Sequence, residues 1–110
     1  MYGLKVQTIR FVDSHQPGWV ECDFLDVDGL RHTIVDKAPM FTCEDLDEDS
    51  KYPTSGIVPC QILERFRNEK GQDVVRVTIA RPSSMQSTEG LEDSVVLAQL
   101  ITSLVSDEKL

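Results

Sequence analysis

The densest group of side chains that could do chemistry is acidic and lies in the stretch CEDLDEDS, residues 43–50. Asp45, Asp47 and Asp49 alternate in the way that the first three ligands of a calcium-binding EF-hand loop alternate. That loop also needs glycine at its sixth position and glutamate at its twelfth, where this chain has Ser50 and Gly56. The EF-hand match therefore fails, and we expect neither a metal site nor a cofactor.

The same acidic segment is a candidate surface for protein contact. The chain has 19 Asp and Glu against 11 Lys and Arg, a net charge of −8, and this charge favours a partner with a basic surface. The leading hypothesis is therefore a non-enzymatic protein–protein interaction module, such as an immunity-type or adaptor protein. Its candidate contact residues are Glu44, Asp45, Asp47, Glu48 and Asp49.

Trp19 is the one tryptophan of the chain and follows directly after Pro17-Gly18. Two interpretations remain open for this residue. Its ring either packs over one end of the core or stands exposed as an aromatic anchor for a partner protein.

No set of residues makes a convincing catalytic site, so we name no catalytic residues. Asp13-Ser14-His15 contains the residue types of a triad, but consecutive residues do not converge on one point. Catalysis by cysteine and histidine needs the two side chains within hydrogen-bond reach. The hairpin pattern described below instead places Cys22 and His32 on opposite faces.

A second class of function remains open beside the interaction module. In this alternative the chain is a small ligand-binding barrel or a hydrolase that uses His32 with Asp23 or Asp36. A deep pocket holding these residues would favour the alternative, and a filled barrel interior would argue against it.

Nucleic-acid binding is the third hypothesis. Neighbouring strands could align a local basic strip made of Lys5, Arg10, Arg65, Arg67, Lys70, Arg76 and Arg81. The net charge argues against it, because binding by phosphate neutralisation needs clustered Lys and Arg.

Length and composition favour one globular domain over residues 1–110, large enough for a single core. The start of the chain lacks the pattern of a signal peptide. The longest uncharged run, residues 94–106, is too short to span a bilayer. Cys22, Cys43 and Cys60 are odd in number and widely spaced, which fits neither a disulfide framework nor a zinc site. We therefore expect a cytoplasmic protein with no membrane contact.

A β-hairpin within residues 16–37 is expected to organise the chain. Asp28-Gly29 favours a two-residue type I′ turn between two β-rich runs. This register pairs Asp26 with Arg31 and Phe24 with Thr33. The predicted core face carries Val20, Cys22, Phe24 and Val35, and the opposite, hydrated face carries Glu21, Asp23, His32 and Asp36.

Further strands are predicted on both sides of this hairpin. Residues 4–13 form the first strand, and residues 57–67 and 73–81 form a second hairpin around a loop at residues 68–71. In that hairpin Ile62 faces Val77 and Cys60 faces Ile79, so both apolar sets lie on one face. Residues 38–56 form a long acidic connection with one short helical turn at residues 44–47.

The end of the chain leaves two alternatives open. Apolar residues recur at helical spacing over residues 96–105, yet a turn at residues 88–90 could lead into a short strand at residues 94–97. If this apolar stripe leaves the barrel, dimerisation would cover it, so the chain is a monomer or a homodimer. The predicted fold is mainly β, a small antiparallel barrel or sandwich that carries at most one short C-terminal helix.

Three phrases of the sequence carry a resemblance: DSHQPGWVECDF at 13–24, HTIVDKAPMFTCEDLDEDSKYP at 32–53 and STEGLEDSVVLAQL at 87–100. They resemble a widespread group of small, uncharacterised bacterial proteins of about this length. QPGWVE and EDLDEDSKYP are the more specific phrases. The resemblance implies a compact β-rich domain similar to the barrel in the second domain of translation elongation factors. It implies no catalytic residues.

Overall fold

The computed structural model describes residues 1–15, 17–42, 44 and 46–104. The chain is mainly β, as the sequence predicts, and its elements follow one another as β1 (Tyr2–Asp13), β2 (Trp19–Leu25), β3 (Arg31–Lys37), the 3₁₀ turn η1 (Ala38–Met40), β4 (Thr54–Arg67), β5 (Asp73–Thr78), β6 (Asp93–Leu97), the 3₁₀ turn η2 (Ala98–Leu100) and β7 (Ile101–Ser103).

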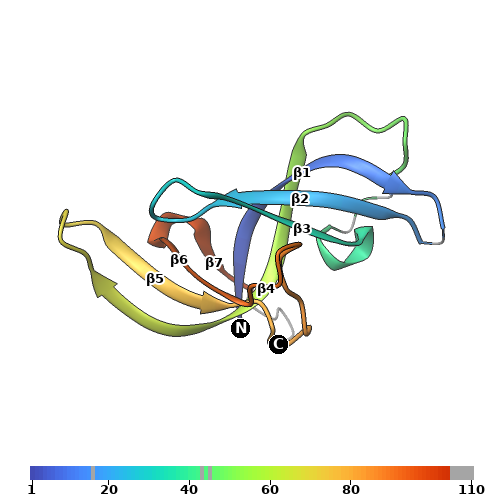
Figure 1. Cartoon of the computed structure of the whole chain (residues 1–110). Helices are drawn as coiled ribbons and strands as arrows, with labels where there is room; N and C mark the ends of the chain where they lie inside the picture. Colours follow the sequence, from blue (N-terminus) through green and yellow to red (C-terminus); the bar gives the residue numbers. More distant parts are fainter. Residues whose placement is uncertain (16, 43, 45, 105–110) are drawn as a thin grey trace, which may run out of the picture.

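All pairings in the sheet are antiparallel, and β1 is its centre (Figure 1). The strand order is β3-β2-β1-β4-β5-β6. Residues 7–13 of β1 pair with β2, while its first residues pair with β7 on one side and β4 on the other. Since β6 pairs with β5, the segment from β6 to β7 links the far end of the sheet back to β1. The sheet therefore curls into a half-barrel.

The inside of this curled sheet is filled by side chains. Alternation along β1, β2 and β3 turns every second residue inward, and each of the central strands contributes to one continuous cluster. Its members are Leu4, Val6, Val20, Cys22, Phe24, Ile34, Ala38, Phe41, Val58, Cys60, Val75, Val77, Ile79, Met85 and Val96.

The predicted core face of β2 is confirmed, but the predicted register of β3 is wrong by one residue. Phe24 faces His32, and Cys22 faces Ile34. His32 and Ile34 are therefore buried, and Val35 is 36% exposed. The predicted Asp26–Arg31 pair does not form.

The physical reason for the shifted register is a five-residue loop at residues 26–30. Asp26 and Leu30 close the loop through a backbone hydrogen bond of 2.9 Å. The carboxylate of Asp26 also accepts the backbone N–H groups of Asp28 and Leu30. Gly29 has φ 80°, the left-handed conformation that glycine adopts without steric cost.

The same loop design occurs at residues 68–72. Asn68 and Gln72 close this loop, and the Asn68 side chain accepts the N–H groups of Lys70 and Gln72. Gly71 has φ 78°. This five-residue loop is one residue longer than predicted, so Arg67 faces Asp73.

The predicted pairing of Ile62 with Val77 is nevertheless confirmed. A bulge between Ile62 and Glu64 absorbs the extra residue, as β-bulges do. The offset introduced by the loop is thereby corrected before the core-facing part of β4.

The C-terminal segment resolves the two alternatives in favour of the strand at residues 94–97. No α-helix follows within the described residues: η2 is a single turn, and β7 then pairs with β1. Of the two alternatives, the C-terminal helix does not form within the residues that the structure describes. The predicted helical turn at residues 44–47 is also absent from the described part of that stretch, and the 3₁₀ turn lies earlier, at η1.

Candidate functional site

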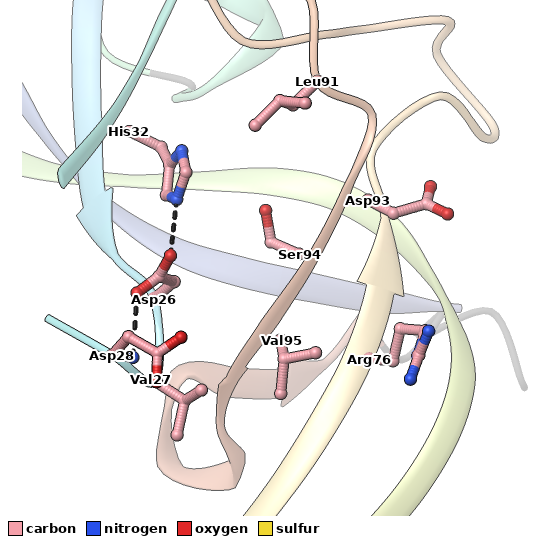
Figure 2. Close-up of a pocket in the computed structure, with 9 residues that line it drawn as sticks. All are labelled: Asp26, Val27, Asp28, His32, Arg76, Leu91, Asp93, Ser94 and Val95. Atoms are coloured by element: carbon pink, nitrogen blue, oxygen red, sulfur yellow. Dashed lines mark hydrogen bonds and ion pairs between the residues drawn. The ribbon is translucent and has the colours of Figure 1, made fainter. Parts of the chain in front are cut away.

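His32 lies in a polar cluster with two carboxylates, and Figure 2 shows its contact with Asp26. Its Nε2 lies 2.8 Å from Oδ2 of Asp26, and its Nδ1 lies 3.4 Å from Oε1 of Glu89. One face of its ring stacks on Phe24 with ring centroids 5.3 Å apart. The cluster thus joins β2, β3, the loop at residues 26–30 and the loop at residues 87–91.

The arrangement favours the positively charged form of His32. Carboxylate oxygens only accept hydrogen bonds, so both ring nitrogens can be satisfied together only when both carry a proton. The hydrogen bond to Asp26, joined by that to Glu89, raises the pKa of His32 although burial opposes the charge. Burial likewise opposes the charge of Asp26, but hydrogen bonds from His32, Leu30 and Asp28 outweigh it and lower the pKa of its carboxyl group.

A cleft of about 270 Å³ opens beside this cluster. Its lining residues come from the loop at residues 26–30, from β3, β5 and β6 and from Leu91; they are Asp26, Val27, Asp28, His32, Arg76, Leu91, Asp93, Ser94 and Val95. A backbone hydrogen bond of 2.8 Å from Val27 to Val95 ties the hairpin loop to β6 at this place.

The cluster differs from the one expected for a histidine-dependent site. Asp23 pairs with Arg31 at 2.6 Å, and Asp36 accepts the backbone N–H of Lys37. The hydrogen-bond partners of the His32 ring are Asp26 and Glu89 instead. The predicted exposure of His32 is wrong because the one-residue shift of β3 turns its side chain inward.

The sequence could have revealed one partner of His32 but not the other. Asp26 opens a D-x-x-G loop, the pattern in which an aspartate binds backbone N–H groups two and four residues on. Glu89 lies 57 residues from His32 in the chain, and no local pattern connects them.

Cys22 and Cys60, the two cysteines that the structure describes, do not form a catalytic site with His32. His32 and Cys22 lie on the same face of the hairpin, contrary to the prediction. However, Sγ of Cys22 lies 3.3 Å from Oγ1 of Thr8, and burial raises its pKa to about 11. Burial also raises the pKa of Cys60 to about 11. Both groups are therefore neutral thiols at pH 7, while the thiolate is the reactive form.

The triad-like stretch at the end of β1 forms one contact on the surface. Nδ1 of His15 lies 2.6 Å from Oδ1 of Asp13, and the side chain of His15 is 86% exposed. The backbone and side chain of His15 lower the pKa of Asp13 by hydrogen bonding. Ser14 forms no hydrogen bond with either residue, so the described stretch 13–15 contains no activated nucleophile.

The acidic segment is exposed where the structure describes it, and Asp47 builds its turn. The Asp47 carboxylate accepts the backbone N–H of Asp49 at 2.9 Å and the hydroxyl of Ser50 at 3.3 Å. The hydroxyl of Tyr52 donates to the Asp47 carbonyl at 2.7 Å. Glu44, Glu48 and Asp49 are exposed, and Asp45 lies outside the described residues.

Metal binding and the basic strip gain no support from the geometry. Within the described ranges, no group of three or more His, Cys, Asp or Glu side chains is placed to hold a metal ion. Three of the candidate basic residues sit beside acids, in the pairs Arg10–Glu21, Arg67–Asp73 and Arg76–Glu64. These pairs reduce the positive charge that a phosphate backbone would meet.

Trp19 is half-buried at the start of β2. It pairs with Asp13 on one side and Lys37 on the other. The ammonium group of Lys37 lies 5.7 Å from the centroid of its ring, within the range of a cation–π contact. Its role as an aromatic anchor stays a prediction.

The fold and the site together define a small antiparallel β protein in which a buried histidine contacts two carboxylates. No protein-family model, curated protein or solved structure matches the chain. In the part of the chain that the structure covers, no helix has the length and apolar character needed to cross a membrane.

Proposed function

We propose that this protein is a non-enzymatic protein-binding module whose acidic segment, residues 44–50, contacts a basic surface of its partner. The observation that carries the proposal is the turn at Asp47, which holds Glu48 and Asp49 outward. Acids presented from an ordered turn lose less conformational freedom on binding than acids on a free chain. The net charge of −8 adds long-range attraction to a basic partner.

Two features of the interior favour binding over catalysis. Among the described residues, core side chains form one continuous cluster inside the curled sheet, which argues against the hollow interior of a ligand-binding barrel. Both nitrogens of His32 face carboxylates, so the ring has no free nitrogen to act as a general base.

The expected compartment and assembly belong to the same proposal. Cys22 and Cys60 are buried free thiols, which agrees with a reducing bacterial cytoplasm. The chain would act there as a monomer or a homodimer, as an immunity-type or adaptor protein. Nucleic acid is not the proposed partner.

The test is affinity capture of the tagged protein from lysate of its own host, with and without RNase. The informative variant is Glu48→Gln with Asp49→Asn, because it removes two exposed charges and leaves Asp47 to build the turn. The matched control is Glu69→Gln with Glu92→Gln, which removes two exposed charges elsewhere. Both variants change the net charge equally.

One dominant protein partner that persists after RNase, is lost in the segment variant and stays with the control supports the proposal. Equal loss in both variants would reduce the contact to general charge attraction and refute a specific site. Absence of any partner, or a partner that disappears with RNase, would also contradict it.

A further inference from the structure

The loop at residues 87–91 is a self-contained unit resting on the outer edge of β3. Ser87 donates its N–H to the Leu91 carbonyl at 2.8 Å, and Gly90 donates to the Ser87 carbonyl at 2.9 Å. The Ser87 hydroxyl also accepts the N–H of Leu91. These bonds lie within the loop, so they survive if the loop moves as a body.

The loop makes polar contacts with two adjacent residues of β3, His32 and Thr33. Thr88 donates its N–H to the Thr33 carbonyl at 2.8 Å, and the two threonine hydroxyls lie 2.6 Å apart. Glu89 contacts His32 at 3.4 Å. Because β3 ends the strand order of the sheet, the loop covers backbone groups that would otherwise form an open edge.

The contact with Glu89 requires His32 to carry a proton on both ring nitrogens, whereas the contact with Asp26 requires only one ring N–H. A neutral imidazole has one N–H, and the shorter contact to Asp26, at 2.8 Å, retains it. The other nitrogen then presents a lone pair to Glu89, and two acceptors repel each other. The Glu89 side chain is 51% exposed, against 14% for Asp26, so Glu89 is the partner that water can take over.

The other charged groups near His32 do not remove this dependence. Asp28 in the adjacent loop and Asp93 on β6 line the same cleft and also favour a cation. Arg76 on β5 opposes the cation, but its guanidinium lies 3.5 Å from Glu64. Arg31, next to His32 in the chain, pairs with Asp23.

We propose that protonated His32 holds the loop at residues 87–91 against β3 through its contact with Glu89. Deprotonation of His32 releases this loop and uncovers the edge of β3 at Thr33. The His32–Glu89 contact does not involve the acidic segment, so this inference is independent of the proposed function. The release occurs above the ordinary pKa of a histidine, because hydrogen bonds to Asp26 and Glu89 raise the pKa of His32.

The test is NMR spectroscopy of the full chain from pH 6 to pH 10. The ring signals of His32 give its titration. Hydrogen-exchange protection of the Thr88 amide, corrected for intrinsic exchange, reports the loop. The Val27 amide, bound to Val95, is the internal control.

We expect Thr88 protection to fall about tenfold at the pH where His32 titrates, the change that corresponds to loss of a hydrogen bond to a charged group. Val27 protection stays constant. In Glu89→Ala, Thr88 protection should be low at every pH and should no longer follow His32, while the Val27 amide confirms an intact fold. The proposal would be contradicted if Thr88 protection stayed constant through the His32 titration. Unchanged Thr88 protection in Glu89→Ala would contradict it as well.

Discussion

Phe24 and His32 face each other across the β2–β3 pair, and their rings stack with centroids 5.3 Å apart. This pairing belongs to the register that the loop at residues 26–30 sets. In that register Ile34 lies in the core, with 1% exposure, and Val35 lies on the outside.

The register predicts losses of stability of very different size for two neighbouring residues. Ile34→Ala should lower the free energy of unfolding by about 2–5 kcal/mol, because it opens a cavity in the core. Val35→Ala should cost less than about 1 kcal/mol, since only strand propensity and partial burial are lost. Urea denaturation of both variants measures this. A larger loss for Val35→Ala would restore the register expected from a two-residue turn.

The Asp26–His32 contact predicts a stability difference that depends on pH. Asp26→Asn keeps one oxygen for the loop N–H groups but removes the charge beside His32, so we expect a loss of about 1–3 kcal/mol. Asp28→Asn, in the same loop, is the control and should change little.

The pH window follows from the directions of the two pKa shifts. The stabilisation from His32 is fully present below its unfolded value of 6.5 and is lost as pH rises through its raised pKa. That from Asp26 is present above 3.8 and is lost as pH falls through its lowered pKa. Urea titrations of wild type and Asp26→Asn should differ most between pH 3.8 and 6.5. A difference that does not vary with pH would contradict the assigned charges.

The buried cysteines should be inert in the folded protein. With burial raising the pKa of Cys22 and Cys60 to about 11, thiolate is scarce at pH 7.5 and reagents cannot reach the sulfur. N-ethylmaleimide should therefore modify these two sites in urea but not in buffer, with each site read by peptide mass spectrometry. Rapid modification of Cys22 in the folded state would reveal an accessible nucleophile that the structure does not predict.

Gly3 should be intolerant of a side chain. It lies on β1 between Pro59 of β4 and Thr102 of β7, and an added Cβ would collide with Ile57 and press on Leu104. We expect Gly3→Ala to lower stability by about 1–3 kcal/mol, as overpacking does. Thermal unfolding measures this, and Gln61→Ala, at an exposed position of β4, is the matched control.

Local chemistry determined much of this fold, including two loops that we assigned too short, each with a register error of one residue at the loop. Residues 26–30 and 68–72 both begin with Asp or Asn and carry glycine at the fourth position. A carboxylate or amide oxygen there accepts N–H groups two and four residues ahead, and the glycine adopts positive φ. The pattern D/N-x-x-G between two strands indicates this loop, and with it the register, without further information.

The sequence alone also determined the inward face of β2, because Val20, Cys22 and Phe24 alternate with acids and only one face can avoid burying charge. Tertiary structure decided the rest. The apolar spacing of residues 96–105 is compatible with a helix, but the backbone of β7 instead bonds to β1, a strand nearly the whole chain away. Glu89 reaches His32 across 57 residues. No local sequence pattern indicates the β7–β1 pairing or the Glu89–His32 contact, because the atoms involved become neighbours only when the sheet curls.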